Sequence, residues 1–514
     1  MHLRQKLALY FFGRSMDRAI NAYDFVLLAQ RARRFDRRYV ANIYYRPTGF
    51  AWKKAFKIPR RRPAIERLNQ IVLTEFNADD QLSILGLRYR ISQLSSDDQL
   101  AVRGLNIDLI LDGADNKSDI YFDLMLLLHA VQDWGSLAKA SESILVREAS
   151  GTDICCLAAD MLIQAKYQLI KVRIFRNSIT KDDVATLAAG LAITENALGP
   201  NHPKQAHYQG LFACVSGDLE RAVALHAGAA ANAAYSTQFF RAASNVISLD
   251  EMKIFARSAP VKIADHCWKQ RHTGHTECTL LSTDFGYFAN YFEGFLESFS
   301  ILNPGGLVHL HAVGFEPEIR RIVDLEERFG VHVNITHDPQ ILSRLSPDIF
   351  KGYCAGARYM YLPQYLALYD RVIIHDIDGI VETSMASVWN GRAGDIMISS
   401  LVPEPDRRGH FAFWSNIGAG AFAIAANPAN HEFAAALSGY LHARFDVCRK
   451  TGGRFFFTDQ IGLLLATLAF ADECKISRMP AIFNQSSESR GQQRGQAKLD
   501  AQEKLLQKLR QSGA

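Results

Sequence analysis

The chain has 514 residues, of which 48% are hydrophobic and 22% are charged, and its formal net charge is +5. This length predicts two or three domains, and the composition is that of a soluble globular protein. No stretch reaches the roughly 18 apolar residues that a membrane-spanning helix needs, which excludes an integral helical membrane protein.

The N-terminal sequence MHLRQKLALYFFGR has a basic start, but its apolar run at 7–12 is short and is closed by Arg14. No small-residue cleavage site follows it, so we do not expect a cleaved signal peptide. Eight cysteines are scattered along the chain without a Cys-x-x-Cys pair, which is typical of a reducing compartment. We therefore expect a cytoplasmic protein.

Positive charge is concentrated near the N-terminus. Residues 1–62 hold 16 Lys and Arg against three Asp, whereas the rest of the chain holds 42 basic and 50 acidic residues. The segments RARRFDRR (31–38) and KKAFKIPRRR (53–62) interleave aromatic and basic residues, which suits an anionic membrane face or nucleic acid. A solvated basic arm explains them equally well. Of the binding partners, we favour peripheral contact with the inner membrane face over nucleic acid.

Residues 63–259 predict almost continuous helix, because apolar residues recur at three- and four-residue spacing and Gly and Pro are sparse. The segment YQGLFACVSGDLERAVALHAGAAA (208–231) resembles a tetratricopeptide repeat, with Gly210 and Ala222 at the small packing positions. An ordinary helical bundle is the alternative. A repeat domain presents a concave surface, where we expect a protein partner or a protein acceptor to bind.

From residue 278 onward, short apolar runs alternate with amphipathic stretches. Strands are predicted at 279–283, 307–313, 331–336 and 372–374, with helices at 285–302, 317–329 and 357–369. This alternation implies an α/β fold with a mostly parallel sheet. We expect the polar tail 486–514 to be disordered, apart from an amphipathic helix through Leu499 and Leu509.

The segment VIIHDID (372–378) places two carboxylates directly after a buried β-branched run. Side chains alternate along a strand, so Asp376 and Asp378 are predicted to project to one side and His375 and Ile377 to the other. Two carboxylates this close repel each other unless a cation lies between them, and Mn²⁺ or Mg²⁺ would serve. At the carboxyl end of a strand, such an ion could hold a diphosphate and neutralise the charge that grows as it departs.

Residues 277–485 resemble nucleotide-sugar glycosyltransferases of the GT-A fold, most closely the family 8 type. Five motifs in the expected order carry this resemblance: STDFGYFANYFEGFLESF (282–299), ARYMYLPQYLALYDRVIIHDIDGIV (357–381), WSNIGAGAFAI (414–424), FFTDQIGLLLA (456–466) and MPAIFN (479–484). The resemblance implies a Rossmann-like GT-A domain at 275–485 that moves a hexose from a nucleoside-diphosphate sugar, first of all a UDP-sugar, to a protein or glycan acceptor with retention. It also implies a Mn²⁺ or Mg²⁺ cofactor.

The same resemblance implies roles for individual residues. The predicted catalytic residues are Asn416, Asp459 and Gln460. The predicted donor-binding residues are Asp284, Tyr287, Arg358 and Gly418, and the predicted metal ligands are Asp376 and Asp378. Gly418 and Gly420 would let the backbone approach a sugar closely. Taken singly, Asn416 is equally explained as a turn residue and Asp459 as a helix N-cap.

The chain departs from the family pattern after Asn484. The family usually supplies a histidine metal ligand there, in a motif that ends in Lys-Pro-Trp, whereas this chain has NQSSESRGQQRG. Gln485, Ser486, Ser487 or water would then complete the metal shell.

Three alternatives stay open at this point. The segment HDIDGIV also resembles the first motif of haloacid-dehalogenase-type phosphatases, with Asp376 as the nucleophile and Asp378 as the acid or base, although that motif normally opens its domain. The chain could instead be a non-catalytic helical-repeat binding protein. Finally, HCWKQRHTGHTEC (266–278) could form a zinc site, although a polar linker is the commoner explanation. The ligands of that site would be Cys267, His272, His275 and Cys278.

Overall fold

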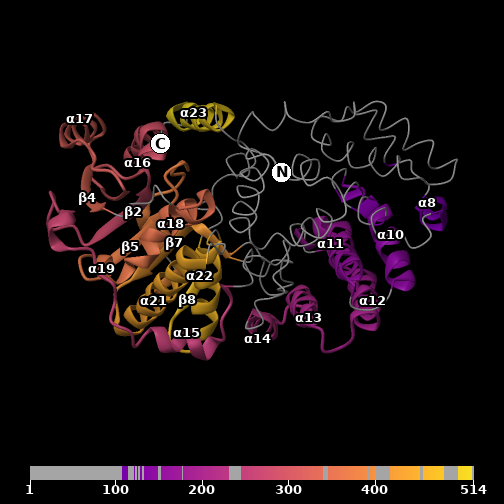
Figure 1. The fold of residues 1–514 in the computed structure, drawn as a ribbon. Coiled ribbons are helices and arrows are strands. Elements are labelled where there is room, and N and C mark those ends of the chain that lie inside the picture. The colour runs from indigo at the N-terminus through magenta and orange to yellow at the C-terminus, as the bar shows by residue number, and fades with distance from the viewer. Residues whose placement is uncertain are drawn as a thin grey trace, which may run out of the picture. The chain divides into compact units, whose positions relative to one another are not determined.

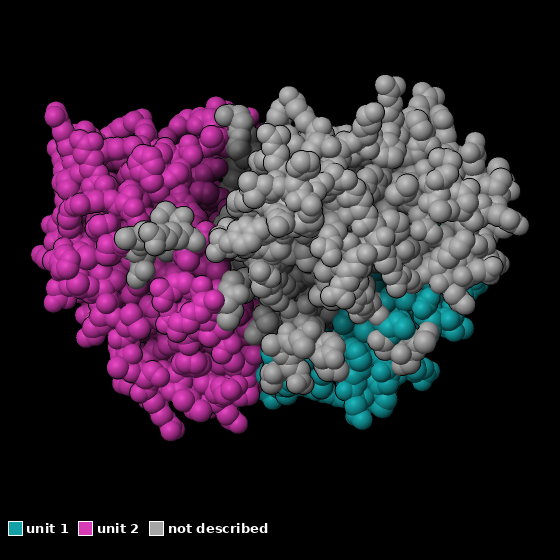
Figure 2. Space-filling model, in the orientation of Figure 1, with its two compact units in different colours: residues 1–244, 406–411 teal, residues 245–405, 412–514 magenta. Residues whose placement is uncertain are grey.

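The computed structural model describes residues 103, 107–113, 121, 124–125, 128–129, 132–148, 152–175, 178–230, 245–339, 345–390, 394–400, 417–451, 455, 457–479 and 496–511. The contacts divide the chain into two compact units, residues 1–244 with 406–411 and residues 245–405 with 412–514 (Figure 2). The predicted basic arm, Asn416 and the segment that follows the last strand lie outside the described residues.

The described part of the first unit is helical (Figure 1). Its helices are α8 (Ile107–Gly113), α10 (Trp134–Arg147), α11 (Asp153–Phe175), α12 (Lys181–Leu198), α13 (Pro203–Val215) and α14 (Leu219–Ala230). A capping box begins α12, because the Thr180 hydroxyl accepts from the Asp183 N–H while the Asp183 carboxylate accepts from the Thr180 N–H. Successive helices pack as neighbours, α10 on α11 and α13 on α14. The helical interpretation is confirmed for these segments, and the tetratricopeptide assignment stays a prediction.

The second unit is built on a mixed sheet, which has eight strands in the part of the chain that the structure describes. The strands are β1 (Trp268–Lys269), β2 (Glu277–Thr283), β3 (Leu307–Val313), β4 (His332–Asp338), β5 (Arg371–His375), β6 (Ile396–Ser400), β7 (Ile417–Ala425) and β8 (Ile476–Arg478). Their order is β1-β4-β3-β2-β5-β7-β6-β8. The four strands β4, β3, β2 and β5 run parallel to one another. The strand β7 is antiparallel to both of its neighbours, β5 and β6, and the edge strand β1 is antiparallel to β4.

Helices cover both faces of this sheet (Figure 1). On one face, α16 (Phe285–Leu302) and α17 (Ile319–Phe329) bury an apolar cluster with strand residues such as Leu281, Leu310 and Ile373. The other face carries α18 (Pro347–Met360), α19 (Leu362–Leu366), α21 (Pro428–Thr451) and α22 (Thr458–Ala469). Ser282, the strand neighbour of Leu281, faces this second layer and donates to the Cys354 carbonyl of α18 at 2.7 Å. The predicted α/β fold is therefore observed.

Segments from both ends of the second unit complete its helical layers. The helix α15 (Leu249–Phe255) packs on α21 and α22, so residues from 245 onward belong to the same compact unit as the sheet. The C-terminal helix α23 (Gln496–Gln511) packs on α16. The amphipathic helix predicted in the tail is thus confirmed, and the rest of the tail lies outside the described residues. None of the described helices is both long and apolar enough to cross a membrane.

The chain reverses its direction across the sheet between β2 and β5. It runs outward from β2 through β3 to β4 and then returns to β5 on the opposite side of β2. In open α/β sheets, ligands bind at the carboxyl ends of the strands at such a switch point. Asp284 directly follows β2 and Asp376 directly follows β5, so both lie at this edge.

Candidate active site

The strand β5 ends one residue before the acidic pair. Residues 376–379 form a turn, in which the Gly379 N–H donates to the Asp376 carbonyl at 3.1 Å. The Asp376 N–H donates to the Gly420 carbonyl of β7 at 2.9 Å, which holds this residue against the sheet. The turn therefore sets the position of Asp378, and strand alternation does not.

His375 and Ile377, the residues on either side of Asp376, face the α16 side. Ile377 is 4% exposed and belongs to the apolar cluster under α16. The buried ring of His375 packs on Phe295 with centroids 5.4 Å apart. The prediction that these two residues point away from Asp376 is consistent with these contacts.

Arg358, on α18, fixes the orientation of the Asp376 carboxylate. Its Nη2 donates to Asp376 Oδ1 at 2.6 Å and to the Ala419 carbonyl at 2.8 Å, and its Nη1 donates to the His375 carbonyl at 2.8 Å. The guanidinium group is buried, whereas the Asp376 side chain is 37% exposed. Burial lowers the pKa of Arg358, but the neighbouring carboxylates, Asp376 first, raise it by more. The net pKa is therefore above the usual value, and the group stays charged. The sequence placed Arg358 near the donor and missed this ion pair.

Gly420 provides the space that this carboxylate occupies. A Cβ atom at Gly420 would lie 2.6 Å from Asp376 Oδ2, closer than any real side chain permits. At Gly418, by contrast, a Cβ would lie 3.1 Å from the Ser399 Oγ of β6. A glycine is therefore needed at position 420 because the Asp376 carboxylate approaches the backbone closely. The sequence instead predicted that a sugar would approach there.

Asp459 lies in the first turn of α22, close to the same arginine. Burial raises the pKa of Asp459, Arg358 lowers it and Asp376 raises it again, so the three charged groups lie within electrostatic reach of one another. Its Oδ1 accepts from the Gln460 N–H at 2.9 Å. The N-cap alternative for Asp459 is wrong, because α22 begins at Thr458 with Phe457 as its N-cap.

The start of α22 combines an unusual backbone conformation with a contact to a residue that is distant in sequence. Phe457 has a φ of 70°, a left-handed conformation that is costly for a residue with a side chain. The buried Asn245 donates from its Nδ2 to Thr458 Oγ1 at 3.0 Å and accepts at its carbonyl from the Tyr440 hydroxyl at 2.8 Å. The sequence showed no sign of this role for Asn245, because its partner Thr458 in α22 lies 213 positions later in the chain.

The predicted base and ribose contacts lie where β2 ends. Asp284 is the N-cap of α16, and its Oδ1 accepts from the Tyr287 N–H at 2.9 Å. Tyr287 and its neighbour Phe285 are 43% and 62% exposed. Burial raises the pKa of Cys354 on α18, and the charge of Asp284 raises it further, which puts this carboxylate close to the helix that carries Arg358. The structure therefore brings Asp284, Arg358, Asp376 and Asp459 to one edge of the sheet.

A buried polar network that the sequence did not predict lies beneath the same edge. His311 of β3 pairs its Nδ1 with the Tyr365 hydroxyl at 2.6 Å and its Nε2 with Asp338 at 3.4 Å. The Tyr353 hydroxyl of α18 also donates to Asp338 at 2.6 Å. These bonds tie α18 to the carboxyl end of β4 and α19 to β3. The signal in the sequence was the alternation of histidine with apolar residues in LVHLHAV (307–313).

The donor atoms of the acidic turn can be compared with those that the predicted metal prefers. Asp376 and Asp378 offer carboxylate oxygens, the ligands that Mg²⁺ and Mn²⁺ prefer, so the donor chemistry fits. Among the residues that the structure describes, His, Cys, Asp and Glu form no group of three or more that could hold a metal ion. The remaining candidates, Gln485, Ser486 and Ser487, lie outside the described ranges.

The four residues considered as zinc ligands do not come together, since the described residues, 266–278 included, hold no group of three or more possible metal ligands. Cys267 and Cys278 are both buried and free. His272 instead pairs its Nε2 with the Glu326 carboxylate of α17 at 2.7 Å. The zinc site considered for residues 266–278 is therefore wrong.

The sequence matches no known protein family and no curated protein. Comparison of folds finds solved structures of glycosyltransferases. The glycosyltransferase GlyE of Streptococcus pneumoniae TIGR4 is similar at 14% identity with a TM-score of 0.26, over 40% of this chain and 45% of that chain. The galactosyltransferase LgtC, in complex with donor and acceptor sugar analogs, is similar at 13% identity with a TM-score of 0.28, over 39% and 72%. Mouse xyloside xylosyltransferase 1 is similar at 12% identity with a TM-score of 0.26, over 40% and 85%. This chain thus spans under half of the GlyE length, and we base the function proposed below on its own residues.

Proposed function

We propose that the chain is a metal-dependent glycosyltransferase that uses a nucleoside-diphosphate sugar. The observation that carries this proposal is the acidic turn at the switch point of the sheet, where a buried arginine fixes Asp376 and where Asp378 follows two residues later. Asp284 lies at the neighbouring strand end, and Asp459 lies within reach of the same arginine. Carboxylates and a guanidinium group at such an edge suit a diphosphate ligand that arrives with a cation.

In the transfer, the bond between the anomeric carbon and the diphosphate oxygen breaks, and the electron pair leaves with that oxygen. An acceptor hydroxyl oxygen bonds to the anomeric carbon, and its proton passes to the departing diphosphate. A divalent ion held by Asp376 and Asp378 would neutralise the negative charge that develops on the diphosphate. Arg358 keeps the Asp376 carboxylate in one orientation, so no reorganisation is needed when the charge appears.

The remaining residues would position the donor sugar. Asp459 would accept hydrogen bonds from sugar hydroxyls or balance positive charge at the anomeric carbon, next to Gln460. Asp284 and Tyr287 would contact the ribose and the base. As finer parts of the proposal, the donor is a UDP-hexose, the configuration is retained, and the acceptor is a protein or a glycan that the helical unit helps to recruit.

A hydrolysis screen of nucleotide sugars tests this function. The full chain is incubated with each donor and Mn²⁺ or Mg²⁺, and release of the free sugar and the nucleoside diphosphate is followed. We expect turnover that stops when the metal is chelated, and a loss of at least about a hundredfold in Asp376→Asn and Asp378→Asn, which is near 3 kcal/mol of barrier.

The two variants differ in how they can fail. Asp376→Asn leaves the buried Arg358 without its charged partner and can destabilise the fold. Asp378→Asn changes a partly exposed turn residue and avoids that cost. The matched control is Asp472→Asn, which changes an exposed aspartate outside the site. If Asp378→Asn turns over donor as fast as the parent chain, or if inorganic phosphate is released instead of sugar, the proposal is wrong.

A further inference from the structure

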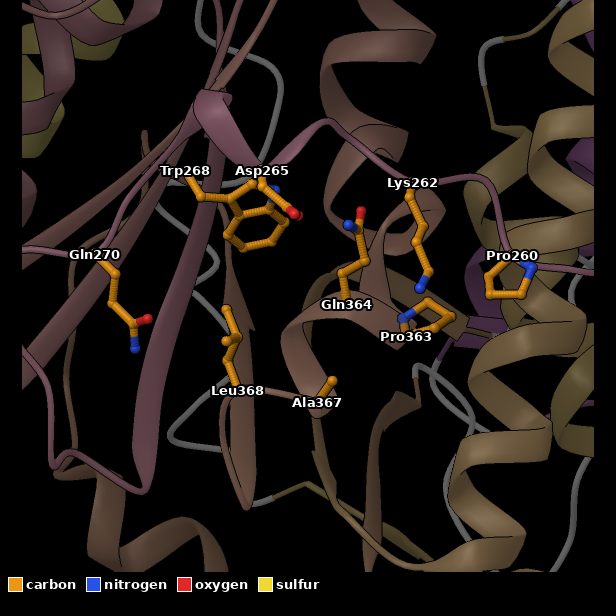
Figure 3. A pocket seen from close by; sticks show the side chains of 9 residues that line it. All are labelled: Pro260, Lys262, Asp265, Trp268, Gln270, Pro363, Gln364, Ala367 and Leu368. Carbon is orange, nitrogen blue, oxygen red and sulfur yellow. The ribbon is translucent and has the colours of Figure 1, made fainter.

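A pocket lies at the outer edge of the sheet, away from the acidic turn. It has a volume of about 420 Å³ and lies between the segment that leads into β1 and the helix α19 (Figure 3). Its lining residues are Pro260, Lys262, Asp265, Trp268, Gln270, Pro363, Gln364, Ala367 and Leu368. This volume falls within the range of small-molecule sites, and none of these residues belongs to the candidate active site.

The indole of Trp268 gives the pocket a fixed apolar wall. Its Nε1–H donates to the Ile263 carbonyl at 3.4 Å, so the polar atom of the ring is already engaged. The ring packs on Tyr365 and His309, with centroids 5.1 and 5.6 Å away. Figure 3 shows Trp268 and Leu368 on one side of the pocket and Lys262 and Pro363 on the other, with Gln364 between them. A ligand that packs on this wall meets a rigid surface.

The opposite wall is also fixed before any ligand binds. The Gln364 side chain pairs with the backbone of Ile263, accepting from its N–H at 2.9 Å and donating to its carbonyl at 3.2 Å. Ile263 is itself 5% exposed. This pairing holds residues 260–265 against α19, and a preformed pocket loses little conformational freedom on binding.

The rim carries polar groups that are not used by the fold. Lys262, Asp265 and Gln270 are exposed, and no hydrogen bond or ion pair joins their side chains to another described residue. Together they offer an ammonium group, a carboxylate and an amide, which provide both donors and acceptors. The single positive and single negative charge cancel, which disfavours a phosphate or an acidic ligand.

We propose that this pocket binds a neutral saccharide. The C–H face of a pyranose ring matches the apolar indole wall, and its hydroxyls match the mixed donors and acceptors of the rim. A wholly apolar ligand would leave the charged rim groups unsatisfied, and a phosphorylated ligand would meet the Asp265 carboxylate. The pocket is an accessory glycan site that does not depend on the chemistry at Asp376.

Direct binding tests this inference. The full chain is titrated with neutral disaccharides (maltose, cellobiose, lactose and diacetylchitobiose), and binding is followed by saturation-transfer NMR and by tryptophan fluorescence. We expect at least one sugar to bind with a Kd of about 1 mM or tighter. The rim variants Asp265→Ala and Gln270→Ala should each weaken it at least about tenfold, because each removes hydrogen bonds to the sugar.

The control and the contrary outcomes are equally specific. His266→Ala changes an exposed residue of the same segment that does not line the pocket, and it should bind the sugar like the parent chain. Both rim variants change exposed side chains without partners in the described structure, so a folding defect is not expected. The inference is overturned if no neutral sugar of the panel binds, if the rim variants bind unchanged, or if a hydrophobic peptide competes where sugars do not.

Discussion

At the scale of single residues, the candidate site depends on how closely one carboxylate approaches a neighbouring strand. Asp376 is held by a hydrogen bond from its N–H to the Gly420 carbonyl and by an ion pair with the buried Arg358. Because its Oδ2 lies where a Cβ of Gly420 would be, the carboxylate can adopt this position only beside a glycine. The identity of one residue in β7 thus controls the geometry of a predicted metal ligand in the turn that follows β5.

The substitution Gly420→Ala should therefore damage activity more than stability. The new methyl group lies 2.6 Å from Asp376 Oδ2 and must displace the carboxylate, which is partly exposed and can move away. We expect donor hydrolysis to fall at least about tenfold, equivalent to about 1.4 kcal/mol, while the midpoint of thermal unfolding changes little. The measurement is kcat/KM for the donor identified in the hydrolysis screen.

Gly356→Ala is the matched control for this substitution. It places a methyl group on α18 near Arg358, but its Cβ would meet only Phe455, at 3.9 Å. Activity equal to that of the parent chain is expected. If Gly420→Ala were as active as Gly356→Ala, the close approach of the carboxylate would have no functional role.

At the scale of elements, the sequence predicted the strands and helices whose burial follows a simple period. The runs at 279–283, 307–313 and 331–336 appear as β2, β3 and β4, because strands that are buried on both faces are rich in apolar, β-branched residues. The helix predicted through Leu499 and Leu509 is observed as α23, because its apolar residues recur at the spacing of one helix face. Local pattern was sufficient for these elements.

Contacts between distant elements could not be read in the same way. The two-residue β1 carries no periodic signal, and its pairing with β4 depends on the whole sheet. The turn at residues 376–379 and the pair Arg358–Asp376 follow from how α18 and β7 meet β5. The sequence therefore predicted which residues gather at the site better than it predicted which of them touch.

The helix pair α13 and α14 offers a sharp test of packing within the first unit. A Cβ at Gly210 of α13 would lie 2.9 Å from the ring of His226 on α14, and that ring is 1% exposed. Alanine in a helix interior usually stabilises relative to glycine by about 0.5–1 kcal/mol. Here the overpacking cost of about 1–3 kcal/mol should exceed that gain, so Gly210→Ala should lower the free energy of unfolding by about 1 kcal/mol.

Gly228→Ala, in the partner helix, should have the opposite sign. No atom of the described residues lies within 4 Å of a Cβ at this exposed position. The free energy of unfolding should therefore rise by about 0.5–1 kcal/mol. Both variants are compared with the parent chain by urea denaturation followed by far-UV circular dichroism, and equal effects of the two substitutions would contradict the packing of His226 on Gly210.

At the scale of the whole molecule, the second unit is held together by segments that are far apart in sequence. The Nε and Nη2 of Arg510 in α23 donate to the Glu297 carboxylate of α16, a residue 213 positions earlier. Leu506 is 3% exposed, and a side chain at Gly294 of α16 would meet Gln502 and Leu506. The C-terminal helix α23 thus covers α16. It supports the helix that Asp284 caps and that contains Tyr287.

Leu506→Ala tests whether this helix is part of the folded unit. The substitution leaves a cavity between α23 and α16, and we expect it to lower the free energy of unfolding by about 2–3 kcal/mol, near the low end for buried leucines because a terminal helix can partly close the gap. Lys504→Ala changes an exposed residue of the same helix and should stay within about 0.5 kcal/mol of the parent chain. Thermal unfolding of the full chain measures both effects. Equal melting temperatures for the two variants would mean that α23 does not stabilise α16, and donor binding at the switch point would then be independent of the C-terminal helix.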